Sequence, residues 1–467
     1  MINVIAIFDI GKTNKKLFLF DEQYRVVWEQ SDICPQTVDE DGEPCEDLAR
    51  LTQWLYTSLA RVAALPDFRI NAINFSAYGA SLVYIDRDGK PIAPLYNYLK
   101  PYPAPLKKKF YDTYGGEITF SMLTASPVLD SLNSGMQLYR IKEELPDLYS
   151  NIAFALHLPQ YLSFLLTGEA CSEITSIGCH TNLWNFSQGH YHEWVYREGV
   201  IDKLAPILPS TTVLPIRRLP VIGQPGGLSG PGEQDRPAGV GGPAIPLAGI
   251  GLHDSSAAMI PYLESFREPF VLISTGTWCI SMNPFDHSPL TVAELQKDCL
   301  CYMSYQGRPV KASRLFAGYE HEQQVQRLAA HFQASPARAA TVAFDADCIA
   351  LLRARDSSGP MAFYRRELTD FTSFEAAYHR LMMDIMDQQV DSTRLVLQDN
   401  NTHRIFVDGG FGRNQVYMHL LARAFPDTEV FTASIPQATA MGAALAIHRH
   451  WNSAPLPGDI IELKYYG

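Results

Sequence analysis

Three segments of the chain combine glycine with hydroxyl or amide side chains, and each follows an apolar run typical of a buried strand. They are Ile5–Asn14, Phe270–Trp278 and Arg404–Asn414. Glycine lets backbone N–H groups approach an anion without an intervening Cβ, and Ser and Thr hydroxyls add further donors. The three segments therefore predict turns that bind a phosphate-rich ligand from both halves of the chain.

The first turn has a carboxylate at the end of its strand. Asp9 precedes Gly11, Lys12, Thr13 and Asn14. Such a carboxylate can hold Mg²⁺ while the turn meets nucleotide phosphates, because Mg²⁺ binds through one or two carboxylates together with phosphate oxygens. An ordinary β-hairpin is the alternative, since short glycine motifs often match by chance.

The other two turns offer different groups. Ser274–Thr277 places three hydroxyls around Gly276, which favours an anion-binding turn over a threonine-rich β-turn. Asp408–Asn414 ends a strand and precedes an amphipathic helix, and its glycines would let a base or ribose approach the backbone. A simple strand–helix connection is the alternative there. The small-residue helix Gln437–Leu445 is expected to pack closely against this third turn.

Asp254 follows a glycine-containing loop and precedes small residues typical of a helix start. A helix cap is the simple interpretation. The chemical interpretation is a general base that takes the proton from a substrate hydroxyl, as phosphoryl transfer to an alcohol requires. The neighbouring His253 is left out of the predicted catalytic group, because a lone histidine is more often packed or hydrogen-bonded.

Strands and helices alternate at the start of the chain. We expect strands at Val4–Ile10, Lys16–Phe20 and Arg25–Glu29, forming a β-meander, then a helix at Ala49–Ala64 and a strand at Ile70–Ser76. This alternation predicts an α/β fold.

The chain of 467 residues exceeds the roughly 250–300 residues that one core supports, so two lobes are expected. We place them at 1–246 and 247–467, with Gly226–Gly242 as a surface loop before the boundary. The second lobe begins a strand-and-turn series at Phe270 that mirrors the start of the first. This similarity predicts a duplicated fold with a ligand between the lobes.

The net charge of −12 argues against nucleic acid and anionic membranes as partners. The eight cysteines show neither CxxC pairs nor zinc-type spacing, which indicates reduced structural thiols. With no cleavable leader and no apolar run of about 18 residues, a cytoplasmic location is expected.

In their order along the chain, these segments resemble the FGGY carbohydrate kinases, a branch of the actin/Hsp70-like ATPase superfamily. Asp9–Lys16 resembles the first phosphate motif of that family, Ser274–Thr277 the second, Asp408–Asn414 the adenosine motif and Pro436–Leu445 the helix that follows. Asp254 falls at the catalytic aspartate. The resemblance covers essentially the whole chain.

The resemblance implies an α/β fold of two actin/Hsp70-like (ribonuclease H-like) lobes with an interlobe cleft, and transfer of phosphate from ATP to a sugar hydroxyl. Asp254 would be the base, and Asp9 and Asp254 would hold Mg²⁺. A homodimer is a family-level expectation. The implied cofactor-binding residues are Gly11, Lys12, Thr13, Asn14, Lys16, Gly276, Thr277, Gly409, Gly410, Gly412 and Asn414.

The segments Ser76–Pro91 and Leu158–Ser176 resemble sugar-facing parts of the family. The implied substrate contacts are Ser76, Tyr78, Gly79, Asn97 and Asp254. His253–Asp254 and Ile273–Trp278 are most similar to rhamnulokinases and L-fuculokinases. This similarity implies a ketose, either a 6-deoxyketohexose (L-fuculose or L-rhamnulose) or a ketopentose such as xylulose.

Four residues depart from the family pattern. Lys12 stands where Thr is usual, Asn97 lies where many members carry a Trp-x-Asp sugar clamp, Gln437 replaces Glu, and Glu173 replaces Asp. Two other functions remain open. One is a degenerate kinase that senses sugar or nucleotide, and the other is an ATP-driven conformational switch without a sugar substrate.

Overall fold

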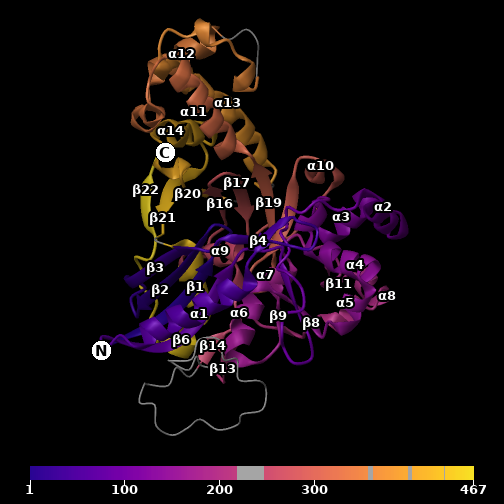
Figure 1. The fold of residues 1–467 in the computed structure, drawn as a ribbon. Coiled ribbons are helices and arrows are strands. Elements are labelled where there is room, and N and C mark those ends of the chain that lie inside the picture. Colours follow the sequence, from indigo (N-terminus) through magenta and orange to yellow (C-terminus); the bar gives the residue numbers. More distant parts are fainter. Residues whose placement is uncertain (218–246, 356–360, 398–401, 436, 467) are drawn as a thin grey trace. The chain divides into compact units, whose positions relative to one another are not determined.

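The computed structural model describes residues 1–217, 247–355, 361–397, 402–435 and 437–466 (Figure 1). The loop predicted at Gly226–Gly242 lies outside these residues. The chain forms two compact units, each made of three segments. Unit 1 comprises Met1–Glu264, Cys301–Pro309 and Pro436–Ile460, and unit 2 comprises Ser265–Leu300, Val310–Ile435 and Ile461–Gly467.

Unit 1 is built on a mixed sheet with the strand order β13-β14-β6-β1-β2-β3, and β15 also pairs with β6. The strands are β1 (Ile2–Ile10), β2 (Asn14–Asp21), β3 (Val26–Ile33), β6 (Phe68–Ala77), β13 (Val213–Pro215), β14 (Leu247–Gly249) and β15 (Leu252–His253). The first three strands are antiparallel neighbours, whereas β6 runs parallel to β1. The predicted meander and the strand after it are therefore confirmed.

The continuous apolar sequence of β1 follows from burial on both of its faces. Successive residues of a strand point to opposite sides of the sheet. Phe8 and Ile10 belong to a core that also holds residues of α1 (Leu48–Ala63) and α6 (Leu158–Thr167). The fully buried Ile5 and Ile7 alternate with them, and α15 (Ala438–Ala446) packs against β1 and β6.

The helix α1 confirms the periodicity seen in the sequence. Its apolar residues at helical spacing, Leu51, Leu55 and Leu59, are buried. The Asp47 side chain accepts a hydrogen bond from the Arg50 backbone N–H at 3.0 Å and so caps the first turn.

A second core in unit 1 is formed mainly by residues 82–207. Its elements are β7 (Leu82–Ile85), α2 (Ala104–Thr113), α3 (Glu117–Thr124), α4 (Ser134–Glu144), α5 (Pro146–Asn151), β8 (Phe154–His157), β9 (Ser172–Glu173), α7 (Ile174–Ile177), β10 (Trp184–Asn185), β11 (His190–Tyr191), α8 (Glu193–Arg197) and β12 (Ile207–Leu208). The short strands β4 (Gln36–Val38) and β5 (Pro44–Glu46) and the helices α9 (Asp254–Ser265) and α16 (His448–Trp451) also lie in unit 1.

The sheet of unit 2 repeats the strand order of unit 1. Its path is β19-β17-β16-β20-β21-β22, with β18 beyond β19. The strands are β16 (Phe270–Thr275), β17 (Cys279–Asn283), β18 (Cys299–Met303), β19 (Pro309–Leu315), β20 (Arg404–Gly409), β21 (Glu429–Ser434) and β22 (Glu462–Tyr465). In both units the first strand pairs antiparallel with the second and parallel with the strand on its other side. This matching order confirms the duplicated fold.

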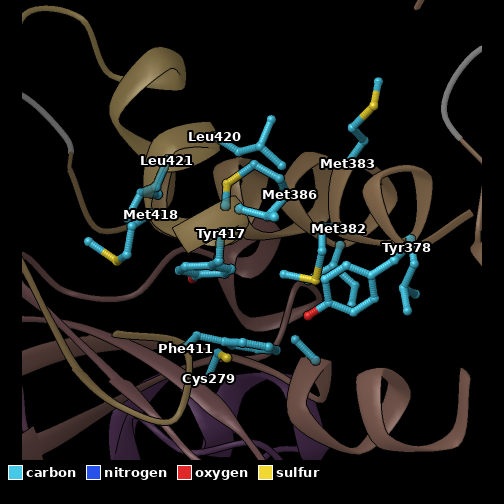
Figure 2. Packing of buried hydrophobic residues seen from close by; sticks show 14 of the residues in the cluster. Cys279, Tyr378, Met382, Met383, Met386, Phe411, Tyr417, Met418, Leu420 and Leu421 are labelled. Carbon is cyan, nitrogen blue, oxygen red and sulfur yellow. The ribbon is translucent and has the colours of Figure 1, made fainter. Parts of the chain in front are cut away.

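The helices of unit 2 cover a methionine- and aromatic-rich core (Figure 2). They are α10 (Val292–Leu295), α11 (Ala317–His331), α12 (Ala346–Arg355), α13 (Phe374–Arg394) and α14 (Gln415–Ala424), and α13 packs against α11 and α14 (Figure 1). The ring of Phe411 stacks on Tyr417 with centroids 4.7 Å apart, and Figure 2 shows Cys279 on its other side. Phe411, which lies in the predicted adenosine turn, is therefore a core residue.

Residues 247–264 lie in unit 1, whereas the predicted division placed them in the second lobe. The reason is strand pairing. Leu247 and Ala248 of β14 pair with β6, and Leu252 and His253 of β15 do the same. The segment therefore completes the first sheet before the chain enters unit 2.

Two further expectations concern the state of the cysteines and the presence of membrane-spanning helices. All eight cysteines are free thiols, and six of them are buried. In the part of the chain that the structure describes, every helix is too short or too polar to cross a lipid bilayer.

Candidate active site

Three parallel strands end at one edge of the unit 1 sheet, and they bring the two predicted carboxylates there. Asp9 near the end of β1 is in register with Ser76 of β6, and Ser76 is in register with Leu252 of β15. Asp254 follows β15 directly and is the first residue of α9. The carboxyl ends of parallel strands are where open α/β sheets bind ligands.

Asp9 is held by a residue from the other end of the chain. The Thr439 hydroxyl on α15 donates a hydrogen bond to Asp9 Oδ2 at 2.8 Å. Burial raises the pKa of Asp9 to about 6, the negative charge of Asp254 adds to this rise, and Thr439 and Lys16 oppose it. The two carboxylates are thus close enough to interact.

One carboxylate oxygen of Asp254 is held by hydrogen bonds, and the other is not. Its Oδ1 accepts hydrogen bonds from the Ser255 backbone N–H at 2.6 Å and the Ser255 hydroxyl at 3.2 Å. Among the described residues, none donates a hydrogen bond to Oδ2, and 31% of the side chain is exposed. Burial raises the pKa of this carboxyl to about 6. Oδ2 is therefore available to accept a proton near neutral pH.

His253 is a packed, hydrogen-bonded residue, as the sequence suggested. It is 3% exposed, and burial lowers its pKa to about 3, so its ring is neutral. Its Nε2 lies 3.0 Å from Cys179 Sγ and 3.1 Å from Asp254 Oδ1. The ring also lies close to that of Tyr302, with centroids 5.7 Å apart.

A buried ion pair stabilises the turn after β1. Lys15, 1% exposed, is paired with Glu46 and donates hydrogen bonds to the Gly11 and Lys12 carbonyls at 2.9 and 3.2 Å. The Gly11 N–H bonds to the Asn14 carbonyl at 3.0 Å, which closes the turn. Thr13 and Asn14 are exposed at its tip.

Lys12 does not extend freely into solvent. Its ammonium lies 5.3 Å from the ring centroid of Tyr78 and 5.0 Å from that of Tyr98, both within the range of cation–π attraction. Burial lowers its pKa, whereas the charge of Glu46 raises it. Within the described ranges, no carboxylate forms an ion pair with Lys12, and its ammonium lies against the faces of two aromatic rings.

Of the four predicted sugar-contacting residues other than Asp254, three have an internal role: Tyr78, Gly79 and Asn97. Ser76 is fully buried in β6, and the Tyr78 hydroxyl donates to Glu46 Oε2 at 2.7 Å. A Cβ on Gly79 would lie 2.8 Å from Cys179 Sγ, so glycine leaves room for that side chain. Asn97 Oδ1 accepts from the Leu99 N–H at 3.0 Å. Their contact with a sugar remains a prediction.

Thr275 joins the two predicted turns of unit 2. Its hydroxyl donates to the Asp408 carbonyl at 2.6 Å and accepts from the Phe411 N–H at 3.0 Å. Gly409 has φ of 90°, and a Cβ there would lie 1.9 Å from the Thr275 carbonyl oxygen. The Gly410 N–H donates to the same carbonyl at 3.1 Å. The parallel pairing of β16 with β20 therefore brings the two motifs together.

The remaining predicted nucleotide-binding residues of unit 2 lie in turns or at the start of a helix. The Gly276 N–H bonds to the Trp278 carbonyl at 2.9 Å, and the Thr277 carbonyl accepts from Tyr319 of α11 at 3.1 Å. A Cβ on Gly412 would lie 3.0 Å from the Val407 carbonyl oxygen. Asn414 caps α14, and its Nδ2 donates to the Tyr378 hydroxyl at 2.6 Å. Asn414 is thus a structural cap.

The carboxylate pair fits Mg²⁺ better than a transition metal. The negative charge of Asp254 raises the pKa of Asp9, and a divalent cation bound beside them would oppose this effect. Nowhere in the described residues do three or more His, Cys, Asp or Glu side chains form a metal-binding group. Two carboxylates suffice for Mg²⁺, because phosphate oxygens and waters complete its shell.

Several residues of the site gave no local signal in the sequence. Thr439 was noted only within a small-residue helix expected to pack on the third turn, yet α15 lies in unit 1, where Gly442 contacts Ala257 of α9. Cys179 was interpreted only as a structural thiol. The buried Lys15 could have been suspected, because three lysines within five residues of a turn, Lys12, Lys15 and Lys16, are more than a solvated face requires.

Two family models match most of the chain. Residues 4–213 match the N-terminal domain of the FGGY family of carbohydrate kinases, and residues 267–455 match the FGGY carbohydrate kinase C-terminal domain. A solved structure of a carbohydrate kinase from Novosphingobium aromaticivorans has a TM-score of 0.77 and 24% identity, covering 98% of this chain and 95% of that one. The two-lobe fold is therefore the actin-like fold of these enzymes.

Curated relatives match a smaller part of the chain. A rhamnulokinase from Mannheimia succiniciproducens is 24% identical over 280 residues, which cover 59% of this chain and 52% of that protein. A probable L-xylulose kinase from Pasteurella multocida is 27% identical over 217 residues, 44% of this chain and 41% of that protein. The chain spans about half the length of the curated relatives it matches.

Proposed function

Since the chain belongs to the FGGY family of carbohydrate kinases, we propose that it transfers the γ-phosphoryl group of ATP to a hydroxyl of a ketose. The observation that carries this proposal is the interacting pair of carboxylates, Asp9 and Asp254, at the carboxyl ends of neighbouring parallel strands. Both carboxylates can serve a metal, and Asp254 can also serve the acceptor.

The two carboxylates and the predicted phosphate turns have separate roles in the proposed reaction. Asp254, through the free Oδ2, orients the acceptor hydroxyl and takes its proton. Asp9 and Asp254 hold Mg²⁺, which when bound neutralises charge on the transferred group. In unit 1 the turn at Gly11–Asn14, which includes the Lys12 ammonium, offers donors to phosphate oxygens. In unit 2 the turns at Gly276–Thr277 and Gly409–Gly412 remain proposed nucleotide contacts, because glycine leaves the backbone open to a ligand.

For the acceptor we propose a 6-deoxyketohexose such as L-rhamnulose or L-fuculose, or a ketopentose such as xylulose. The similarity to a rhamnulokinase and to a probable L-xylulose kinase supports this class. Asn97 lies where many members of the family carry a Trp-x-Asp sugar clamp, so this region offers an amide in place of that carboxylate. The unpaired ammonium of Lys12 favours acidic acceptors as a second candidate class, with its charge compensated by a substrate carboxylate.

The experiment is coupled ADP release with Mg·ATP across L-rhamnulose, L-fuculose, D- and L-xylulose, L-ribulose, glycerol and gluconate. Activity on a neutral ketose supports the first class, and activity on gluconate alone supports the acidic class. ATP binding without turnover on any acceptor would overturn the kinase and favour a sensor. ATP turnover without any acceptor would favour a conformational switch.

The pH dependence follows from the raised pKa values. Asp254 must be ionised to take a proton, so kcat/KM is expected to fall as pH drops through about 6, roughly tenfold per pH unit. If Asp9 must be ionised as well, the slope steepens, and raising Mg²⁺ moves that step to lower pH because the cation favours the charged form. Measurement of kcat/KM from pH 5 to 8 at two Mg²⁺ concentrations tests this. A flat profile down to pH 5 would contradict it.

A further inference from the structure

A chain of hydrogen bonds in unit 1 runs from a backbone carbonyl to α9 through three side chains. His180 Nδ1 lies 3.2 Å from the Leu132 carbonyl oxygen, and His180 Nε2 lies 3.2 Å from Cys179 Sγ. Cys179 Sγ lies 3.0 Å from His253 Nε2, and His253 Nδ1 lies 3.3 Å from the Ser256 hydroxyl.

For a neutral His180 ring, the carbonyl at one end fixes the direction of these four bonds. A carbonyl only accepts, so His180 Nδ1 carries the proton, and Nε2 of the neutral ring is then an acceptor. The Cys179 thiol then donates to His180 and must accept from His253 Nε2–H. His253 Nδ1 is left as an acceptor for the Ser256 hydroxyl. The chain thus specifies the Nε2–H tautomer of His253.

The tautomer of His253 determines whether an N–H or a nitrogen lone pair faces the Asp254 carboxylate. His253 Nε2 is 3.1 Å from Asp254 Oδ1, so the N–H edge of the ring faces the carboxylate. The opposite tautomer would place a nitrogen lone pair against the same oxygen. With the two bonds from Ser255, Oδ1 is surrounded by donors, which keeps the carboxyl turned so that Oδ2 remains for another partner.

We propose that His253 is a positioning residue for Asp254, and that Cys179 and His180 act by fixing its tautomer. The proposal rests on the proposed function, in which Asp254 accepts the proton of the acceptor hydroxyl. It assigns a role in turnover to a cysteine whose sulfur contacts the rings of His180 and His253.

The residues around His180 and His253 favour this arrangement of the two rings. Gly79 has no Cβ where one would lie 2.9 Å from the His253 ring. His180 adopts a φ of 39°, a left-handed conformation that a non-glycine residue keeps only when its surroundings require it. The His253 backbone N–H donates to Thr175 Oγ1 at 3.0 Å, and Thr175 donates in turn to the buried Glu173 at 2.5 Å.

The kinetic test compares variants that keep or remove the N–H edge. His253→Leu is expected to lower kcat by about 10- to 100-fold, the range seen when a residue that orients a functional ligand is lost, with little change in the KM of the acceptor. His253→Gln, which restores an N–H near the Nε2 position, should recover most of kcat. Cys179→Ser should retain activity, whereas Cys179→Val should lose it in the same direction as His253→Leu.

The matched control is His157, another buried neutral histidine of unit 1, whose Nε2 contacts the Ser134 hydroxyl at 3.1 Å. His157→Leu should leave kcat per folded molecule unchanged. Wild-type kcat in His253→Leu, alongside an inactive Asp254→Asn, would overturn the positioning role and leave the proposed function intact. Near-normal turnover in Asp254→Asn would instead overturn the proposed function.

A second readout needs no substrate. The ¹⁵N resonances of histidine distinguish protonated from unprotonated ring nitrogens in the wild-type protein. We expect Nε2 of His253 to be protonated and Nδ1 unprotonated, and Cys179→Val to lose this fixed assignment. An Nδ1–H tautomer in the wild-type protein would overturn the proposal, even where His253→Leu fails to fold.

Discussion

Asp254→Asn is expected to lower kcat by at least about 10²-fold, the low end for removal of a positioned general base. The amide keeps the shape and can still accept the Ser255 hydrogen bonds, but it cannot take the proton of an acceptor hydroxyl. Steady-state ADP release with the acceptor found active is the measurement. An Asp→Asn change at the exposed Asp112, which pairs with Lys108, is the matched control and should keep full activity.

The same substitution should not lower stability, which separates lost chemistry from lost fold. The pKa of Asp254 is raised in the folded state, so its ionisation opposes folding, and this effect grows as pH rises from about 4 through about 6. The Asn variant lacks this effect. Its Tm should therefore equal or exceed that of the wild type at pH 7, and the difference should vanish below pH 4. Near-normal turnover in this variant would contradict the assignment of the base.

Gly442→Ala is expected to destabilise unit 1 and to lower activity. A Cβ at this position would lie 1.8 Å from the Ala257 carbonyl oxygen, so α15 and α9 would have to separate. Overpacking of this kind typically costs about 1–3 kcal/mol and sometimes more. The two helices carry Thr439 and Asp254, so the displacement also disturbs the carboxylate pair.

Thermal unfolding and kcat are the measurements for Gly442→Ala, and a Tm lower by several degrees is expected. Gly458→Ala is the matched control, because a Cβ there meets no atom within 4 Å in the same unit. Wild-type Tm and kcat in Gly442→Ala would contradict the close packing of α15 on α9.

Local periodicity was enough to predict the elements that open each unit. The apolar run of β1 and the helical spacing of Leu51, Leu55 and Leu59 both reflect burial that the sequence pattern encodes directly. The duplicated order could be predicted because each unit begins with the same strand-and-turn signal. Asp9 was singled out because an apolar strand ends with it, and Asp254 because a glycine-containing loop leads into a helix start there.

Contacts between distant segments could not be predicted in this way. Thr439 reaches Asp9 across 430 positions, and Cys179 reaches His253 across 74. No local pattern encodes such pairs, since they depend on how the sheet and helices assemble. The roles of Tyr78 and Asn414 were likewise missed as internal hydrogen-bonding residues, because a polar side chain in a motif is equally compatible with a ligand and with a structural partner.

The segment order of unit 1 has a consequence for synthesis on the ribosome. Chains emerge and fold from the N-terminus onward, yet unit 1 takes α15 from Pro436–Ile460, after most of unit 2 has been made. A nascent chain that stops before this segment lacks the helix covering one face of β1 and the hydroxyl that binds Asp9. The unit that starts the chain is thus completed late, and its exposed apolar strand face is the point at which a stalled chain would be open to chaperones or aggregation.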